Sequence, residues 1–416
     1  MDFKFIHAAD VHLDSPLRGL ERYEGAPVDE IRGAVRRAFI NLIDMCIRER
    51  VKFLVLAGDL YDGDLLDYQT GLFFAAQMSR LRASGIKVYI VLGNHDAQSE
   101  VTKGVRLPDN VHLFSADTPH TIYDEELGVA LHGWSYPTRA VTEDVSRRYP
   151  EPAFGFYNIG ILHTSLDGRE GHDNYAPCSL QDLIRKGYNY WALGHVHQRE
   201  IAAENPLVVF PGNIQGRHIR ETGPKGCMLV EVLNGQTHLQ FRPLDVLQWA
   251  VCTADITGVK SPEEALDLAV EQLQDQIAVS GGKLHAVRFI IEGATKVNNQ
   301  LQRNKDHFIY NLRAAVNDVS RGSVWLEKVL VETRQVADLE ALFDEHPTLK
   351  DFFRILHEFA EDTSLREELE AELRGFYNMI PKEAVIGEDG LNLNDSRFLE
   401  TIIAQAKKLI ADELVS

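Results

Sequence analysis

The chain has 416 residues, of which 44% are hydrophobic, 25% charged and 9% aromatic. This length fits two or three domains, which bury a full core without disulfides or a structural metal. The four cysteines (Cys46, Cys178, Cys227 and Cys252) are scattered, which argues against a disulfide framework or a thiolate zinc site and fits a reducing cytoplasm. With no apolar run of about 18 residues and no signal-peptide pattern, we expect a cytoplasmic protein that does not span a membrane.

The net charge of −19 is unevenly distributed along the chain. Residues 336–416 hold 19 acidic and 8 basic residues, a net charge of −11, so that only −8 remains for residues 1–335. An acidic chain is a poor candidate for sequence-independent nucleic-acid binding, which needs Lys and Arg against phosphate. Because most of the acidic excess lies in the tail, it says little about a site in the N-terminal part.

Short apolar runs alternate with helical patterns over residues 1–245. Helices are predicted at Arg32–Arg50 and Leu65–Ser84, between early strands. Buried strands are predicted at Phe3–Ala9, Phe53–Ala57, Val88–Leu92, Ile159–Leu162, Trp191–Leu193, Val208–Phe210, Cys227–Val232 and Thr237–Arg242. The alternation predicts a layered α/β domain.

A second pattern covers residues 246–335 and predicts a small α+β domain. It reads β-α-β-α-β, with elements at Trp249–Ile256, Pro262–Ala278, Ala286–Glu292, Asp306–Val319 and Trp325–Glu332. Residues 336–416 are acidic and carry three apolar stripes at helical spacing, which predict a helical tail. Its stripes fit either packing within the chain or docking on a partner.

Five polar motifs directly follow predicted strands. They are Asp10-Val-His12, Gly58-Asp59, Gly93-Asn94-His95-Asp96, His163 and Gly194-His195-Val-His197. Ligands bind outside the carboxyl ends of strands in open α/β sheets, so all five motifs are expected to converge on one cleft. An extended Asp-x-His puts both side chains on one side, because strand side chains repeat every two residues.

The donors in these motifs predict a site for two metal ions. Mixed imidazole and oxygen ligands suit Mn, Fe, Co or Zn better than Mg or Ca. There are more ligands than one ion needs, and two ions about 3.5–4 Å apart form a site for phosphoester hydrolysis.

This combination resembles the calcineurin-like metallophosphoesterase superfamily over roughly residues 1–245. The resemblance implies a four-layer αββα sandwich followed by a small α+β capping domain and a C-terminal helical segment. It implies that Asp10, His12 and His197 bind the first metal, that Asp59 bridges, and that Asn94, His163 and His195 bind the second. It also implies that His95 is the general acid or transition-state stabiliser, with Asp96 fixing its tautomer.

Two other motifs narrow the resemblance to one branch. Gly63 follows Asp62 where protein Ser/Thr phosphatases carry Arg, and Tyr61 does not stand at the ligand position of purple acid phosphatases. The opening Phe5–Leu17 and the stretch Pro211–His218 instead resemble a bacterial DNA-repair exonuclease branch, SbcD-like and YhaO-type. That branch implies a Mn-dependent exonuclease and endonuclease that binds DNA and works with an SbcC-like SMC-type ATPase. The capping domain would help select DNA ends, and the tail would dock on the ATPase.

Several alternatives stay open at this point. Arg217, His218 and Arg220 form either a substrate contact or a solvated loop, and Arg32–Arg50 leaves a homodimer open. Five further histidines (His7, His112, His132, His172 and His238) are expected to be structural. Besides a DNA nuclease, the site fits a phosphodiesterase for a small cyclic or dinucleotide, and the fold fits a non-catalytic DNA-end tether.

Overall fold

The computed structural model describes residues 2–15, 25–61, 68–98, 106–166, 176–277 and 283–335, together with Asp351 and Arg354. The predicted tail, residues 336–416, lies outside the described residues apart from those two positions. The chain divides into two compact units, one built from residues 1–252, 277–288 and 317–328, the other from residues 253–276, 289–316 and 329–416. The predicted domain boundaries after residues 245 and 335 stay predictions.

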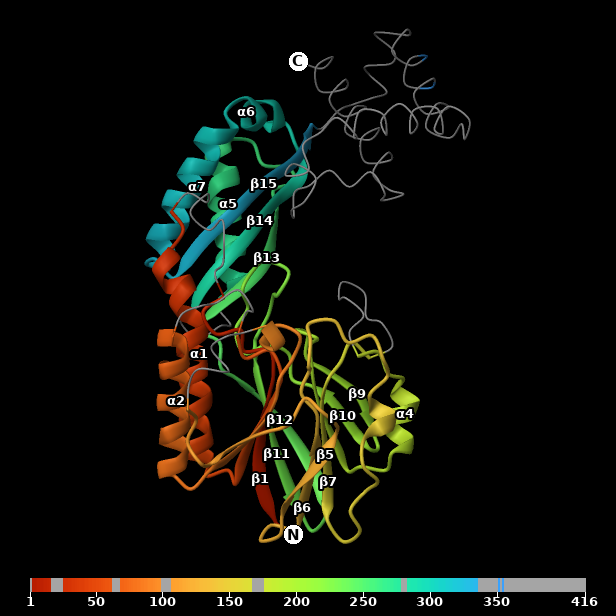
Figure 1. Ribbon diagram of the computed structural model, residues 1–416. Coiled ribbons are helices and arrows are strands. Elements are labelled where there is room, and N and C mark those ends of the chain that lie inside the picture. Colours follow the sequence, from red (N-terminus) through yellow and green to blue (C-terminus); the bar gives the residue numbers. More distant parts are fainter. Residues whose placement is uncertain are drawn as a thin grey trace. The chain divides into compact units, whose positions relative to one another are not determined.

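Two six-stranded sheets form the first unit (Figure 1). The first has the strand order β12-β11-β1-β2-β3-β4 and the second β5-β6-β7-β8-β10-β9. The first sheet comprises β1 (Phe3–Ala8), β2 (Phe53–Ala57), β3 (Lys87–Val91), β4 (Val111–Leu113), β11 (Gly226–Leu233) and β12 (Gln236–Pro243). The second comprises β5 (His120–Asp124), β6 (Val129–Gly133), β7 (Tyr157–His163), β8 (Tyr190–Gly194), β9 (Glu200–Glu204) and β10 (Leu207–Phe210).

The central strands of both sheets are parallel, which places their carboxyl ends at one edge. β1, β2, β3 and β4 pair in parallel, as do β6, β7, β8 and β10. The register sets Ala57 opposite Val91 in the first sheet and His163 opposite Gly194 in the second. The polar motifs that follow these strands therefore share an edge, as the sequence predicts.

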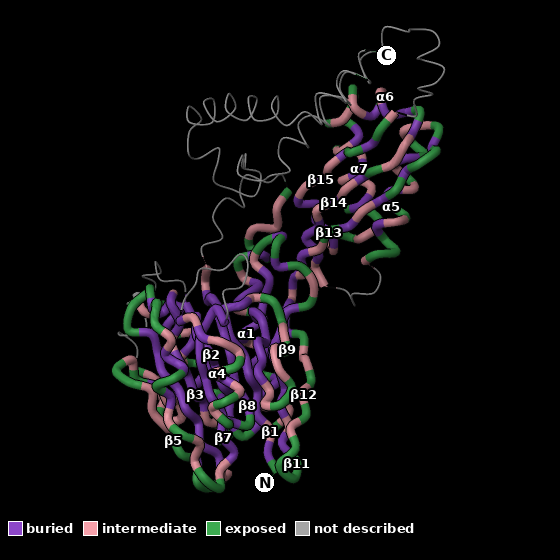
Figure 2. The backbone as a smooth tube through the Cα atoms, turned by 90° about the vertical axis from the view of Figure 1, so that its right-hand side faces the viewer, coloured by how far each residue is buried: buried purple, intermediate pink, exposed green. Residues whose placement is uncertain are grey.

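The apolar residues of these strands separate into layers. Aromatic and aliphatic side chains of both sheets, including Phe5, Phe53 and Ile159, form one buried cluster between them. A second cluster packs α1 (Val28–Glu49) and α2 (Tyr68–Ala83) against the first sheet. A third lies against the second sheet and includes residues of α4 (Leu180–Arg185). These layers confirm the predicted sandwich, and Figure 2 shows the buried path of its strands.

A three-stranded sheet of order β13-β14-β15 follows. Its strands are β13 (Leu247–Asp255), β14 (Leu284–Thr295) and β15 (Val324–Gln335). The helices between them are α5 (Pro262–Ile277), α6 (Asn298–Arg303) and α7 (Lys305–Ser320). The α5 and α7 patterns bury residues at helical spacing, such as Ala265 and Ala269 in α5 and Phe308 and Leu312 in α7. The predicted β-α-β-α-β order is therefore found here, with α6 as an unpredicted addition.

Four strands of the sandwich, β4, β5, β6 and β9, are not among the predicted ones, and β9 has no fully buried residue. β4 and β5 carry few fully buried residues, so their sequences lack the continuous apolar run by which a buried strand is recognised. β6 (Val129–Gly133) is buried throughout, but His132 interrupts its apolar run. None of the helices in the described ranges is long and apolar enough to cross a membrane.

Candidate metal centre

Three of the five motifs contain residues with a left-handed backbone conformation. Asp10, His12 and Asp59 have φ angles of 50°, 49° and 51°, and His195 has a φ of 99°. Such left-handed conformations are uncommon for residues other than glycine, and they concentrate at functional sites where the surrounding structure enforces them. Four polar residues that follow strands of both sheets share this conformation. This concentration indicates a functional site at the carboxyl ends of the strands.

The expected extended geometry of Asp10-Val-His12 is wrong. β1 ends at Ala8, and the motif curls instead of continuing the strand. Its backbone follows the neighbouring loop: the Asp10 N–H donates to the Gly58 carbonyl at 3.1 Å, and the His12 N–H donates to the Asp59 carbonyl at 2.9 Å. This pairing, rather than strand periodicity, aims both side chains at the same site.

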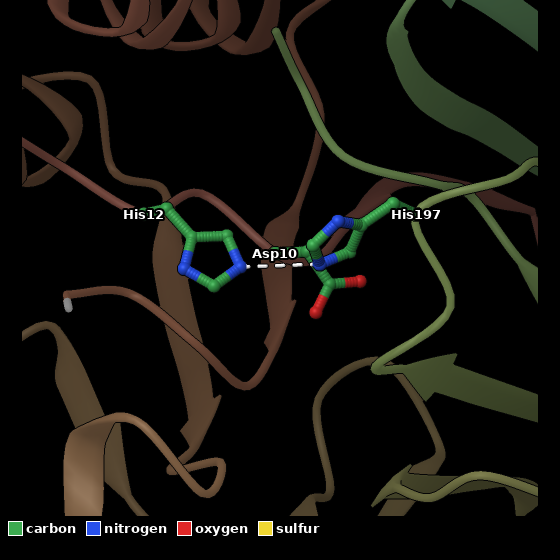
Figure 3. Close-up of side chains that lie close together, drawn as sticks. All are labelled: Asp10, His12 and His197. Atoms are coloured by element: carbon green, nitrogen blue, oxygen red, sulfur yellow. Dashed lines mark hydrogen bonds between the residues drawn. The ribbon is translucent and has the colours of Figure 1, made fainter. Parts of the chain in front are cut away.

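Asp10, His12 and His197 form the first group of candidate ligands (Figure 3). Their ligand atoms all lie within 4.8 Å of one another. The Nε2 atoms of His12 and His197 face each other at 3.2 Å. Asp10 and His12 are each 1% exposed. Asp10 and His197 are 187 positions apart in the sequence. The three residues are those that the resemblance implies as ligands of the first metal.

Asp59, His163 and His195 form a second group. His163 Nε2 lies 3.4 Å from Asp59 Oδ2 and 2.9 Å from Asn94 Oδ1, so the structure also brings Asn94 to this group. Asp59 Oδ2 lies 3.8 Å from His12 Nε2 as well, between the two groups. The other oxygen, Oδ1, accepts the backbone N–H of His95 at 3.0 Å. This division of its oxygens suits Asp59 to the bridging position.

Two glycines let the motifs approach this closely. A Cβ atom on Gly194 would lie 1.8 Å from the carbonyl oxygen of Ala57, and one on Gly93 would lie 2.3 Å from Asp59 Oδ1. No side chain fits at such distances. The Gly-His and Gly-Asn spacings of the motifs therefore follow from the packing of the sheet edges.

His95 and Asp96 occupy different environments. His95 joins His12 and Asp59 in a third group of possible ligand atoms, and its ring centroid lies 5.1 Å from that of His12. Asp96 is 1% exposed, and its two oxygens accept the backbone N–H groups of Tyr61 and Gly93, each at 2.9 Å. The structure thus shows Asp96 holding two loops together, whereas its expected control of the His95 tautomer stays a prediction.

The buried charges of the centre favour a cation. Burial lowers the pKa of His163, but the nearby carboxylates of Asp59 and Asp10 outweigh this effect and raise the pKa to about 9. Burial likewise raises the pKa of Asp59, but the imidazoles of His163, His12 and His95 hold it well below its usual range. Burial raises the pKa of Asp10. The buried carboxylates therefore stabilise a positive charge on the His163 ring. The same negative charge would stabilise a metal cation bound in place of that proton.

Comparison with known proteins agrees with this geometry. The calcineurin-like phosphoesterase family model matches residues 3–199, and a model named metallophosphoesterase YhaO, middle domain, matches residues 249–334. The uncharacterized metallophosphoesterase YhaO of Bacillus subtilis is 36% identical over 376 residues, which cover 89% of this chain and 90% of that protein. The chain belongs to the calcineurin-like metallophosphoesterase family.

More distant similarities extend beyond this relative. The DNA double-strand break repair protein Mre11 of Sulfurisphaera tokodaii is 23% identical over 316 residues, covering 72% of this chain and 76% of that protein. A solved structure of a dimetal phosphatase from Danio rerio has 13% sequence identity and a TM-score of 0.35, covering 58% of this chain and 96% of that one.

Metallophosphoesterases of this family use a dinuclear metal centre, and the donors present here fit one. The chain supplies carboxylate oxygens, an amide oxygen and imidazoles, the mixture suited to Mn, Fe, Co or Zn. All seven predicted ligands lie in the two adjoining groups. The identity of the metal stays a prediction.

The three residues predicted as substrate contacts differ in their exposure to solvent. The His218 and Arg220 side chains are on the surface, the former 49% exposed. Arg217 is 14% exposed, and its Nη2 atom donates to Glu221 Oε1 at 3.3 Å. Lys225, a further basic residue that follows this loop, is 5% exposed and donates to the His197 carbonyl at 2.9 Å. Lys225 therefore supports the centre from within.

Sequence reasoning missed Glu221. Its Oε1 atom lies 2.7 Å from His197 Nδ1, and the residue is 5% exposed. A metal-binding histidine usually donates its second ring N–H to a carboxylate or a carbonyl. Glu221 stands in the polar loop 24 residues after His197, so the sequence does offer a carboxylate for this role.

The histidines expected to be structural include three with defined partners. His7 lies 3.0 Å from the Tyr190 hydroxyl and 3.1 Å from the Leu193 carbonyl, and burial lowers its pKa to about 3. His132 lies between Thr121 and Asn158, and His112 stacks on Tyr89. The three side chains thus have partners within the sheets, and their structural role stays a prediction. His172 lies outside the described residues.

Proposed function

We propose that this metallophosphoesterase hydrolyses phosphodiester bonds of DNA, as an exonuclease at duplex ends and an endonuclease on single strands. We further propose Mn²⁺ as its metal, a role in DNA repair, and action in the cytoplasm with an SbcC-like SMC-type ATPase. The observation that carries the hydrolytic proposal is Asp59, whose Oδ2 atom lies between His12 and His163, where a bridging ligand must be. The similarity to proteins named for DNA double-strand break repair supports the choice of DNA.

Two groups of residues would hold the metal ions. Asp10, His12 and His197 would hold one, Asn94, His163 and His195 the other, and Asp59 would bridge. Two bound cations in such a site lower the pKa of a coordinated water and polarise the phosphoryl group.

The proposed task of His95 is proton transfer at the leaving oxygen. Its backbone N–H is tied to Asp59 Oδ1 at 3.0 Å, so the imidazole is carried by the same loop that positions the bridging carboxylate. Asp96 anchors that loop through Tyr61 and Gly93. General acid catalysis by a positioned histidine contributes about 10²–10⁴-fold to rate.

The loop around His218 and Arg220 is the proposed contact for the DNA backbone. The two side chains are exposed, and the loop that carries them is joined to the centre through Glu221 and His197. Exposed basic groups beside a phosphoesterase site suit the phosphates that flank the scissile bond. Arg217, which pairs with Glu221, contributes by holding this loop.

The experiment is a Mn²⁺-dependent assay of the full chain on linear duplex DNA, circular single-stranded DNA and a small phosphodiester. Asp59→Asn and His95→Ala serve as catalytic controls, and the exposed His238→Ala serves as the matched histidine control. The proposal predicts DNA cleavage that is lost in the first two variants and retained in the third. Turnover of only the small diester would reject DNA as the substrate. Adding an SbcC-like ATPase tests the partner, because stimulated cleavage is expected.

A further inference from the structure

Glu221 and His197 are joined by a short hydrogen bond beside the first group of ligands. Glu221 Oε1 lies 2.7 Å from His197 Nδ1, while His197 Nε2 points toward Asp10 and His12 (Figure 3). The Glu221 carboxylate also accepts hydrogen bonds from the Arg217 guanidinium, the Arg217 backbone N–H and the Asn213 amide, which is the hydrogen-bonding pattern of an ionised carboxylate. An ionised carboxylate only accepts hydrogen bonds, so the proton of the pair lies on Nδ1.

We propose that Glu221 is a positioning residue that prepares His197 to bind a metal ion, and that it makes the two halves of the dinuclear centre unequal. With Nδ1 donating to Glu221, a neutral His197 exposes the lone pair of Nε2 toward His12 Nε2, 3.2 Å away. His12 Nε2–H can donate to this lone pair, and a metal cation bound between the two rings would take the place of that proton. This inference rests on the proposed dinuclear centre and concerns its metal affinity rather than its substrate.

The corresponding histidine of the second group has a weaker partner. His163 Nδ1 lies 3.0 Å from the backbone carbonyl of Ala57, a neutral acceptor, and 4.0 Å from Asp10 Oδ1, which is beyond hydrogen-bond distance. A carboxylate partner raises the basicity of an imidazole ligand more than a carbonyl does, because it stabilises the positive charge that develops on the ring. Loss of Glu221 is therefore expected to weaken binding of the metal ion beside His197 more than binding of the metal ion beside His163.

Glu221 is itself held in place by its surroundings. Its second oxygen, Oε2, accepts the Arg217 backbone N–H at 2.7 Å and the Asn213 amide at 2.9 Å. Arg217 Nη2 lies 3.3 Å from Glu221 Oε1 and from His197 Nδ1, and since a guanidinium only donates, its partner is the carboxylate. A carboxylate fixed at both oxygens keeps the imidazole of His197 in a single orientation.

The loop that carries Glu221 is anchored to the first strand of the three-stranded sheet. Trp249 Nε1 donates to the Gly216 carbonyl at 3.1 Å, and Gln215 Nε2 donates to the Leu247 carbonyl at 2.6 Å. Ile219 and Trp249 also belong to one buried apolar cluster. These contacts hold the loop against β13. The loop in turn fixes the position of Glu221, and Glu221 fixes the orientation of the His197 ring.

The test is calorimetric titration of the metal-free full chain with Mn²⁺, comparing wild type with Glu221→Gln and Glu221→Ala. One of two binding steps is expected to weaken by about 10–100-fold, more in Glu221→Ala, because the Gln amide oxygen still accepts the Nδ1 proton. The other step is expected to change much less. Thermal unfolding of the metal-free proteins identifies any general loss of structure.

Glu327→Gln is the matched control, because Glu327 is another buried carboxylate paired with an arginine, Arg288, at 2.8 Å. It is expected to leave both Mn²⁺ steps unchanged. Wild-type affinities in both Glu221 variants would overturn the inference. So would equal weakening of both steps that tracks a lowered unfolding temperature. A chain that binds two Mn²⁺ ions but leaves DNA intact would reject the proposed substrate and leave this inference standing.

Discussion

The backbone N–H of His195 donates to the carboxylate of Asp10, at 2.9 Å to Oδ1 and 3.0 Å to Oδ2. This contact joins the first motif of the chain to the last across 185 positions of sequence. It fixes the carboxylate of one candidate ligand through the main chain of another. The loops of the centre are therefore joined by hydrogen bonds between their candidate ligands. A substitution in one loop is expected to shift the ligands carried by the others.

His95→Ala is predicted to lower phosphodiester turnover by about 10²–10⁴-fold, the range for loss of a general acid. Mn²⁺ stoichiometry is expected to stay at two, because the seven residues proposed as ligands are all retained. Turnover is measured on the best substrate, and metal content by mass spectrometry of the same samples. Wild-type turnover in this variant would remove His95 from the mechanism.

Asp59→Asn is predicted to weaken Mn²⁺ binding and abolish turnover, because an amide bears no charge and gives only one oxygen to the space between His12 and His163. The Oδ1 atom of Asp59 also accepts the His95 backbone N–H, so one oxygen would have to serve both purposes. Metal content after dialysis checks this result. Two tightly held ions in Asp59→Asn would contradict the bridging role.

Gly194→Ala is predicted to lower the free energy of unfolding by about 1–3 kcal/mol or more, as overpacking of a core does. Its Cβ would lie 1.8 Å from the Ala57 carbonyl, so the backbone must shift, and Mn²⁺ binding is expected to weaken with it. Gly33→Ala is the control, because a Cβ at that position of α1 meets nothing within 4 Å. Alanine there is expected to stabilise the helix by about 0.5–1 kcal/mol. Urea unfolding measures both variants.

Stability is predicted to depend on His7 in mildly acidic solution. Burial lowers its pKa from 6.5 to about 3, so between these values the unfolded chain binds a proton that the folded chain does not. The contribution of neutral His7 is complete above pH 6.5 and is lost as the pH falls toward 3, by at most about 1.4 kcal/mol per pH unit.

Urea unfolding of wild type and His7→Gln at several pH values isolates this effect. The variant is expected to lose less stability than wild type between pH 6.5 and 4.5. His238→Gln, a change at an exposed histidine, should follow wild type. Parallel curves for wild type and His7→Gln would show that His7 does not titrate as described.

Much of the sandwich and of the centre could be predicted from the sequence, for a specific physical reason. Buried parallel strands are continuous apolar runs, and each of β1, β2, β3, β7 and β8 ends in a polar motif that periodicity can locate. The resemblance then ordered these motifs into two ligand sets, and the structure brings all seven residues together.

What could not be predicted depends on contacts between distant segments. The left-handed turn at Asp10 and His12 follows from backbone pairing with Gly58 and Asp59, which strand periodicity does not show. Glu221 acquires its role only because its loop folds back on His197. Similarly, β4 and β5 lack a buried run because their side chains are mostly half-exposed.

The central claim is that Asp10, His12 and His197 hold one metal ion, that Asn94, His163 and His195 hold another, and that Asp59 lies between. Crystals of the full chain grown with Mn²⁺ and measured at the manganese absorption edge test it most directly. The account predicts two anomalous peaks about 3.5–4 Å apart, one against each group, with Asp59 touching both. A single peak, or peaks away from these seven residues, would contradict it.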